Sequence, residues 1–278
     1  MNPVRVAFLT SIRDIGKDEK GGTVVATREG PRYMEGVIER FVTETRTQGA
    51  LFGYAELAFV VTDDMPKDLQ GSPYPTSPES GVPWIHPLTL KVGSGLLVAD
   101  VTVNIPSVFR ALPREATAER AAEKLRFERA VLDAMRMVKA DVLISDHYMA
   151  RVEHLVGSLG LFGKVLNIHP AITLHGHEFA FPGKTPTRDA IARARSGQTV
   201  FTGATLHVMD GEIDHGPPVA YMAGTPVYAD DEPEYLRYRN YQASKLPLFI
   251  GGLRHYIGRI YPHLGSIDLS SLEARKER

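Results

Sequence analysis

The sequence contains no cysteine. This absence excludes disulfide bonds, thiol nucleophiles and thiolate-bound metal sites, and it fits a reducing compartment. A strong charge of either sign is missing too, since 32 Lys and Arg stand against 33 Asp and Glu and the formal net charge is -1. No electrostatic field therefore favours nucleic acid or an anionic membrane as a partner. We expect a cytoplasmic protein that binds neither.

Long apolar segments are also missing. The opening apolar run, residues 4–9, is too short for a secretory signal and leads into the charged residues Arg13 and Asp14. No segment reaches the roughly 18 consecutive apolar residues that a membrane-spanning helix needs. With 43% hydrophobic and 23% charged residues, the composition is that of a soluble globular protein with a sizeable core.

A glycine-rich phosphate turn is the third absence. Phosphate and dinucleotide sites on parallel sheets use such a turn after the first strand, where backbone N–H groups hold the phosphates. Here the first predicted strand is followed by residues 10–16, with the sequence TSIRDIG and no GxGxxG pattern. A nicotinamide-dependent enzyme is therefore disfavoured.

Short apolar runs alternate with helical patterns along most of the chain. Strands are predicted at residues 4–9, 57–61, 96–103, 142–144, 165–168 and 202–208, and helices at residues 117–138 and 187–196. A further helix is predicted within residues 31–45, where Tyr33, Val37, Ile38 and Phe41 fall on one face. This alternation predicts an α/β fold with an open, mostly parallel, Rossmann-like sheet that carries helices on both faces. The stretch of residues 64–87, rich in Pro, Ser and Gly, predicts a long loop and is a candidate lid.

Polar residues gather at the predicted strand ends. Asn167 and His169 lie two residues apart near the end of one strand, so the strand period of two puts them on the same face. Open parallel sheets bind their ligands at the carboxyl ends of the strands. Asp214 follows another predicted strand, in a polar turn that ends at the backbone-permissive Gly216.

An amide, an imidazole and a carboxylate at one sheet edge suit acyl transfer to an amine. The attacking nitrogen generates a tetrahedral oxyanion, which the amide of Asn167 and a protonated His169 would stabilise by hydrogen bonding. Asp214 would keep His169 protonated and correctly aimed, and would help to move the proton from the attacking amine to the leaving nitrogen. We therefore predict Asn167, His169 and Asp214 as catalytic residues that need neither a metal ion nor a covalent intermediate.

Four motifs, taken in order, resemble the signature of the formyltetrahydrofolate-dependent formyltransferases. They are NIHP at residues 167–170, FPG at 181–183, GATLH at 203–207 and IDHGP at 213–217. The resemblance covers roughly residues 4–227. It implies the formyltransferase fold, N10-formyltetrahydrofolate as the formyl donor, and the same three catalytic residues.

The resemblance also implies where the folate lies, namely against the loop after the fourth strand and against the turn before Asp214. The folate-binding residues would be Tyr148, Met149, Ala150, Arg151, Val152, Val208, Met209, Asp210 and Ile213. Candidates for binding the acceptor are Ser11, Arg13, Arg28 and His207, of which His207 fits a buried structural histidine equally well. The chain would divide into a formyltransferase domain, residues 1–226, and a short helical C-terminal extension, residues 227–278, packed on the same domain.

Departures from the family pattern bear on the acceptor, which we expect to be a small molecule. The missing phosphate turn disfavours glycinamide ribonucleotide, and the eight Lys and Arg against seven Asp and Glu after Pro226 are too balanced for a tRNA-binding domain. The loop at residues 171–178, the segment at 21–25 and the long loop at 64–87 look most like the hydroxyornithine formyltransferases of hydroxamate siderophore pathways. N5-hydroxyornithine is the predicted acceptor; glycinamide ribonucleotide and amino sugars are the alternatives.

Two functions of other classes remain open. His169, His175, His177 and Asp214 could supply the ligands of a metal-dependent hydrolase, although Asn167 would then have no evident role. The other alternative is a folate-binding protein without catalysis, which is disfavoured because none of the three catalytic residues is missing. Nothing in the sequence bears on the oligomeric state.

Overall fold

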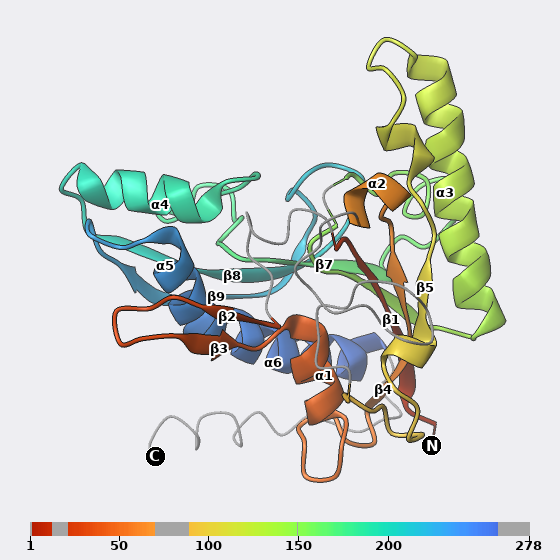
Figure 1. Ribbon diagram of the computed structural model, residues 1–278, viewed down its shortest axis with the longest axis horizontal. Helices are drawn as coiled ribbons and strands as arrows, with labels where there is room; N and C mark the ends of the chain where they lie inside the picture. Colours follow the sequence, from red (N-terminus) through yellow and green to blue (C-terminus); the bar gives the residue numbers. More distant parts are fainter. Residues whose placement is uncertain (1, 13–21, 70–88, 149, 261–278) are drawn as a thin grey trace.

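The computed structural model describes residues 2–12, 22–69, 89–148 and 150–260 (Figure 1). Its strands are β1 Val4–Thr10, β2 Thr23–Val25, β3 Arg32–Met34, β4 Ala55–Thr62, β5 Thr102–Asn104, β6 Val142–Ser145, β7 Val165–His169, β8 Val200–Val208 and β9 Pro218–Val227. Within these residues a seven-stranded sheet has the order β5-β4-β1-β6-β7-β8-β9, and β2 pairs with β3. The strands from β5 to β7 are parallel, whereas β8 is antiparallel to both its neighbours. The mostly parallel sheet is therefore confirmed.

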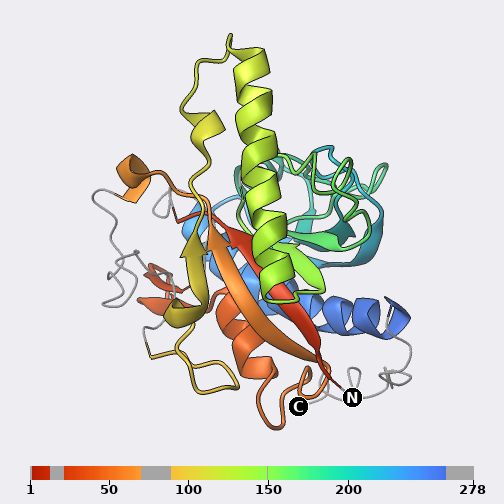
Figure 2. The same ribbon diagram turned by 90° about the vertical axis from the view of Figure 1, so that its right-hand side faces the viewer.

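Helices cover both faces of this sheet, as predicted. They are α1 Val37–Glu44, α2 Pro66–Leu69, α3 Thr117–Met137, α4 Pro186–Arg195, α5 Pro233–Asn240 and α6 Leu246–Ile260, with the 3-10 turns η1 Ala99–Val101 and η2 Val108–Arg110 and the π-helical turn η3 Tyr241–Lys245. α3 crosses one face of the sheet, while α1 and α6 cover the other (Figure 2). No helix in the described ranges combines the length and the hydropathy that a membrane span needs.

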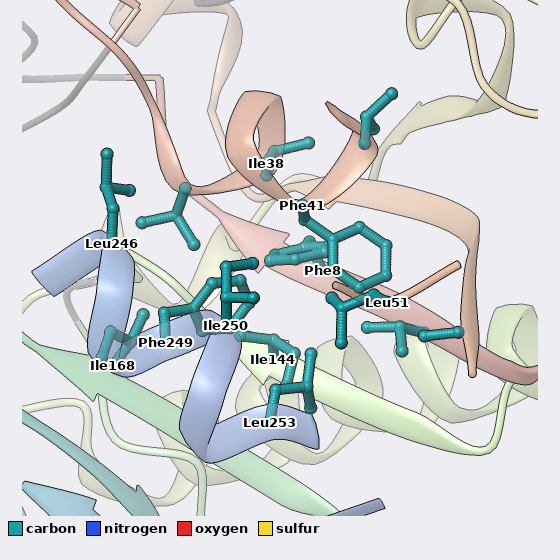
Figure 3. Close-up of a cluster of buried hydrophobic side chains, with 14 of the residues drawn as sticks. Phe8, Ile38, Phe41, Leu51, Ile144, Ile168, Leu246, Phe249, Ile250 and Leu253 are labelled. Atoms are coloured by element: carbon teal, nitrogen blue, oxygen red, sulfur yellow. The ribbon is translucent and has the colours of Figure 1, made fainter. Parts of the chain in front are cut away.

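Side chains that alternate along the central strands build a core on each face, because neighbouring residues of a strand point in opposite directions. Phe8 of β1 packs between α1 and α6, with ring centroids 5.3 Å from Phe41 and 6.1 Å from Phe249 (Figure 3). Leu9 of β1 and Leu143 of β6 belong to the opposite cluster, which packs against α3. The strand ends between these two layers are where a site can open.

Residues 227–260 contribute to the core. In α6, Leu246, Phe249, Leu253 and Ile257 are buried at a spacing of three or four residues, which makes one apolar stripe. Gly252 lies against β8, where an added Cβ would come within 3.0 Å of the Leu206 side chain. The division into a catalytic domain and an extension between residues 226 and 227 stays a prediction. The helix α6 packs directly on one face of the sheet.

One predicted strand is mostly wrong. The apolar run at residues 96–103 is mostly not a strand: the Asp100 carboxylate accepts a hydrogen bond from the backbone N–H of Leu97, which closes a turn ahead of η1, and only the end of the run joins β5. The helix predicted within residues 31–45 is confirmed as α1, which begins at Val37 because Gly36 adopts an extended conformation (φ -85°, ψ 162°) at its N-cap. Tyr33, expected on the apolar helix face, lies in β3 and is 45% exposed.

Two further predicted elements are confirmed, one strand was not predicted, and one segment cannot be compared. The helix predicted at residues 187–196 is confirmed as α4, and the strand at 202–208 as part of β8. The chain also forms β9, a strand absent from the prediction. Residues 70–87 of the candidate lid lie outside the described residues.

Candidate active site

A pocket lies at the carboxyl ends of β6 and β7, beside the facing residues of β8. Its lining includes Asn167, His169 and Asp214, the three residues predicted as catalytic. It also includes Ser145 at the end of β6 and Lys245 at the end of η3. The sheet thus brings together groups that are up to 100 residues apart, at the edge where parallel sheets bind ligands.

Strand register aligns three polar residues across the floor of this pocket. Ser145 of β6 pairs with Asn167 of β7, and Asn167 pairs with His207 of β8. Residues paired in register on neighbouring strands point to the same face of a sheet. Ser145, Asn167 and His207 therefore form one polar row, with His169 at the end of β7 beyond it.

Asn167 and His207 hold each other in place. The side-chain nitrogen of Asn167 donates a hydrogen bond to Nε2 of His207 over 3.1 Å, and Nδ1 of His207 donates to the carbonyl oxygen of Val208 over 3.2 Å. Burial lowers the pKa of His207, which favours the neutral ring that this pattern requires. The amide of Asn167 keeps its second N–H for a ligand.

His169 lies between two oxygen acceptors. Its Nδ1 is 3.3 Å from Oδ1 of Asp214, and its Nε2 is 3.3 Å from the carbonyl oxygen of Phe181. The side chains of His169 and Asp214 are each only 8% exposed. With Nδ1 facing the carboxylate of Asp214, Nε2 is the ring nitrogen that can donate to a substrate oxygen or nitrogen, by exchanging its contact with the carbonyl oxygen of Phe181.

Asp214 is an anion surrounded by donors. Burial would raise the pKa of its carboxyl group, but the hydrogen bond from His169 and the one from the backbone N–H of Gly183, 2.9 Å from Oδ2, lower it below the usual value. Oδ1 also lies 3.9 Å from Nε2 of His207, so the carboxylate is placed between two imidazoles. The backbone of Asp214 has a left-handed φ of 55°, a conformation that Asp tolerates better than most residues.

The turn that carries Asp214 needs a glycine two residues later. A Cβ at Gly216 would lie 1.7 Å from the carbonyl oxygen of Val208, closer than any real contact. Gly216 is therefore required because the chain passes close to β8. Gly211, earlier in the same turn, is required for a different reason, since its φ of 94° is a conformation that favours glycine.

The residues predicted to bind folate divide into two groups. Tyr148, Ala150, Arg151, Met209 and Ile213 line the pocket. Val152 is buried in the core beside α3, Val208 ends β8, and Asp210 forms a 2.8 Å ion pair with the exposed His215. Met149 lies outside the described residues.

Of the residues predicted to bind the acceptor, His207 alone among those described lines the pocket. Ser11 is buried and donates a 2.6 Å hydrogen bond to Asp63. Arg28 forms a 2.8 Å ion pair with Asp230 at the surface. Arg13 lies outside the described residues.

The ligand set of the metal hydrolase alternative is not assembled. In the described part of the chain, no three His, Asp or Glu side chains are grouped so that they could hold one metal ion. His177 packs against Phe179 and Tyr221, and its Nδ1 accepts a hydrogen bond from the backbone N–H of Phe179. This arrangement gives the alternative no geometric support.

Lys245 is one of the pocket residues that the sequence analysis did not predict. It lies in the predicted C-terminal extension, and its ammonium group is buried against Asp146. A signal was present in the sequence, because Lys245 is the only charged residue between Asn240 and Arg254 in an otherwise apolar and small-residue stretch. Buried lysines need a partner or a function.

Comparisons with known proteins show the family and the fold. The sequence profile of the formyl transferase family matches residues 103–248, just over half of the chain. The phosphoribosylglycinamide formyltransferase of Bacillus subtilis (strain 168) is 31% identical over 101 residues, which are 36% of this chain and 46% of that protein. The chain thus matches about half the length of that curated relative.

Solved structures with the same fold include PvdF of pyoverdin biosynthesis, described as an N10-formyltetrahydrofolate-dependent formyltransferase. The TM-score is 0.78 at 29% identity, and the match covers 90% of this chain and 97% of that one. For glycinamide ribonucleotide transformylase 1 from Symbiobacterium toebii, the TM-score is 0.56 at 17% identity, with 92% and 89% covered. The family match spans the stretch from β7 to η3 that carries Asn167, His169, Asp214 and Lys245, and the chain belongs to the formyl transferase family.

Proposed function

We propose that this protein transfers the formyl group of N10-formyltetrahydrofolate to an amine or hydroxylamine nitrogen of a small acceptor, with N5-hydroxyornithine as the best candidate. The observation that carries the proposal is the convergence of Asn167, His169 and Asp214 in one pocket. Family membership and the likeness to PvdF support the choice of donor.

In this reaction the acceptor nitrogen attacks the formyl carbon, and the carbonyl oxygen becomes an oxyanion. The free amide N–H of Asn167 and an N–H of His169 would donate to that oxygen, where each donor contributes about 10²–10³-fold in rate. The bond from the formyl carbon to N10 then breaks. The proton lost by the acceptor nitrogen reaches N10, and Asp214 stabilises the protonated His169 through the transfer.

The chemistry of the lining fits a folate. Met209, Ala150 and Ile213 provide apolar surface beside the polar catalytic groups, and Ile213 is 49% exposed, which leaves an apolar wall for a planar ligand to cover. Arg151 also lines the pocket and is paired with Glu212 over 3.4 Å. We propose that these residues hold the donor with its formyl group toward Asn167.

The acceptor is argued from two observations. The first strand lacks a glycine-rich phosphate turn, which disfavours a phosphorylated acceptor. The likeness to PvdF covers nearly the whole of both chains, and PvdF belongs to pyoverdin biosynthesis. The first disfavours ribonucleotide acceptors and the second supports N5-hydroxyornithine and a place in hydroxamate siderophore formation. A cytoplasmic location stays a prediction.

Glycinamide ribonucleotide is the second candidate acceptor. Its support is the Bacillus subtilis relative, a phosphoribosylglycinamide formyltransferase. An acceptor panel separates the candidates: the full chain is incubated with N10-formyltetrahydrofolate and with N5-hydroxyornithine, ornithine, glycinamide ribonucleotide or an amino sugar nucleotide, and the release of tetrahydrofolate is followed. We expect N5-hydroxyornithine to turn over fastest, and preferential turnover of glycinamide ribonucleotide would reject the proposed acceptor.

His177→Ala separates the transferase from the metal hydrolase. His177 lies outside the pocket lining, so transferase activity should be unchanged in this variant and should resist chelation. A hydrolase that used His177 as a ligand would lose activity in both cases.

A further inference from the structure

Lys245 presents a buried positive charge to the pocket. Its ammonium nitrogen donates to Oδ1 of Asp146 and to the hydroxyl of Tyr241, each over 3.0 Å, and its side chain is 3% exposed. Burial acts to lower the pKa of Lys245, but the charge of Asp146 and the hydroxyl of Tyr241 outweigh it and raise the pKa. The lysine is therefore charged throughout the working pH range.

Lys245 and its partner Tyr241 lie on an unusual secondary-structure element. Tyr241 and Lys245 are the two ends of η3, a single π-helical turn between α5 and α6. π-helical turns inside helical segments are frequent at functional sites. A buried ion pair also contributes little net stability compared with well-packed apolar residues, so packing alone gives no reason for a charge at this position.

Ser145 directly precedes Asp146 in the chain and also lines the pocket. It is 1% exposed, and its Oγ has no hydrogen-bond partner within the described residues. Buried hydroxyl groups are nearly always paired, so an unpaired one on a pocket wall is available to a ligand. Its register partner on β7 is Asn167, about 4.8 Å away at the spacing of neighbouring strands.

We propose that Lys245 and Ser145 bind the carboxylate of the acceptor, while Asp146 positions the lysine. The third N–H of the ammonium group and the hydroxyl of Ser145 supply two donors, which is what one carboxylate needs. The inference rests on the proposed function, because it assumes that the acceptor nitrogen reacts beside Asn167.

The spacing defines the class of acceptor. The carboxylate subsite includes Ser145 of β6, whereas the proposed reaction takes place beside Asn167 on the neighbouring strand β7. The reacting nitrogen must therefore be separated from the carboxylate by several bonds. An amino acid that reacts through a nitrogen at the end of its side chain fits this requirement, whereas an α-amino group is too close to its own carboxylate. The other cations of the lining, Arg151 and Lys184, are exposed and remain for the donor.

Equilibrium binding tests the subsite without depending on turnover. The probes are ornithine and 1,4-diaminobutane, which is ornithine without its carboxylate, titrated calorimetrically into the full chain with and without tetrahydrofolate. We expect the unaltered protein to bind ornithine at least about tenfold more tightly than the diamine. Lys245→Met should reduce ornithine affinity to that of the diamine, Ser145→Ala should reduce it severalfold, and diamine affinity should fall in neither.

Two further variants guard against effects on folding. Lys245→Met leaves Asp146 buried without a partner, so the double variant Lys245→Met with Asp146→Asn removes both charges and should show the same loss. Arg239→Met is the matched control, because Arg239 lies on α5, which leads into η3, and forms a partly buried ion pair with Asp231 outside the pocket lining. Its ornithine affinity should equal that of the unaltered protein.

Three results would overturn the subsite: equal affinity of the unaltered protein for both probes, an equal loss for both probes in Lys245→Met, or a loss of tetrahydrofolate affinity in place of ornithine affinity. The last would assign the lysine to a carboxylate of the donor. A failure of the proposed function would give a different result. The protein would still bind ornithine more tightly than the diamine, but it would release no tetrahydrofolate from N10-formyltetrahydrofolate in the presence of N5-hydroxyornithine.

Discussion

At the residue scale, the pocket gives its two histidines different surroundings. His207 is buried with one ring nitrogen accepting from Asn167, whereas His169 has an oxygen atom at each ring nitrogen. The first arrangement requires a neutral ring, whereas the second places an acceptor beside each ring nitrogen. A pair of imidazoles with opposed environments is a common means of assigning a donor role to one group and a positioning role to the other.

Asp214→Asn tests the pairing with His169. We expect kcat to fall by about 10²–10⁴-fold, because the neutral amide cannot stabilise a protonated His169. The fold should persist, since Asn tolerates the left-handed φ of 55° and has the same shape. Steady-state kinetics across pH measure the effect, with the exposed Asp133→Asn as a control; an unchanged pH profile in Asp214→Asn would argue against a coupled histidine.

His207→Gln tests the neutral histidine through stability. Because burial lowers the folded-state pKa of His207 below 6.5, the unfolded chain binds a proton that the folded chain does not as pH falls through that value. Stability should therefore decrease from pH 7.5 to pH 5.5 and decrease less in the variant, where Gln can still accept from Asn167. Urea midpoints at the two pH values measure this, and an equal decrease in both proteins would contradict it.

At the element scale, the sequence predicted best where short-range patterns decide. β7 and α4 were expected from periodicity and Pro placement, and both form where predicted. β9 was missed because its residues alternate poorly between buried and exposed, and its existence depends on antiparallel pairing with β8. Pairing between strands is a tertiary property that no local pattern reports.

The turn between β8 and β9 yields the element-scale prediction. Gly216→Ala should displace Asp214 from His169, since the new Cβ would collide with the Val208 carbonyl in β8. We expect a lower melting temperature and a large loss of kcat. Gly93→Ala is the matched control, because nothing lies within 4 Å of a Cβ there, and its kcat and melting temperature should match those of the unaltered protein.

At the scale of the whole molecule, residues 227–260 contribute both to the hydrophobic core and, through Lys245, to the pocket wall. The convergence of Asn167, His169 and Asp214, which we propose as catalytic, was predictable because the motifs that carry them are local and ordered. The role that we propose for Lys245 and Ser145 was not, because it depends on η3 packing against the end of β6, almost 100 residues earlier in the chain. Local motifs indicate the proposed reaction, whereas the fold is needed to place the residues around it.

Phe249→Ala tests the role of α6 in the core. The ring is fully buried against Phe8 and Phe41, so its removal should cost about 3–5 kcal/mol of unfolding free energy. The surface residue Phe52, 56% exposed, provides the control, and Phe52→Ala should change stability little. Denaturant unfolding measures both variants; equal small effects would mean that α6 is dispensable for the core.

The most direct test of formyl transfer at this pocket follows the formyl carbon itself. The full chain is given N10-formyltetrahydrofolate labelled in the formyl group together with N5-hydroxyornithine, and the label in the acceptor and the tetrahydrofolate released are measured for the unaltered protein, Asn167→Ala and His169→Ala. We predict equal amounts of labelled acceptor and tetrahydrofolate, with rates at least about 10²-fold lower in either variant and unchanged thermal unfolding. Transfer at a comparable rate in folded Asn167→Ala and His169→Ala would contradict the account.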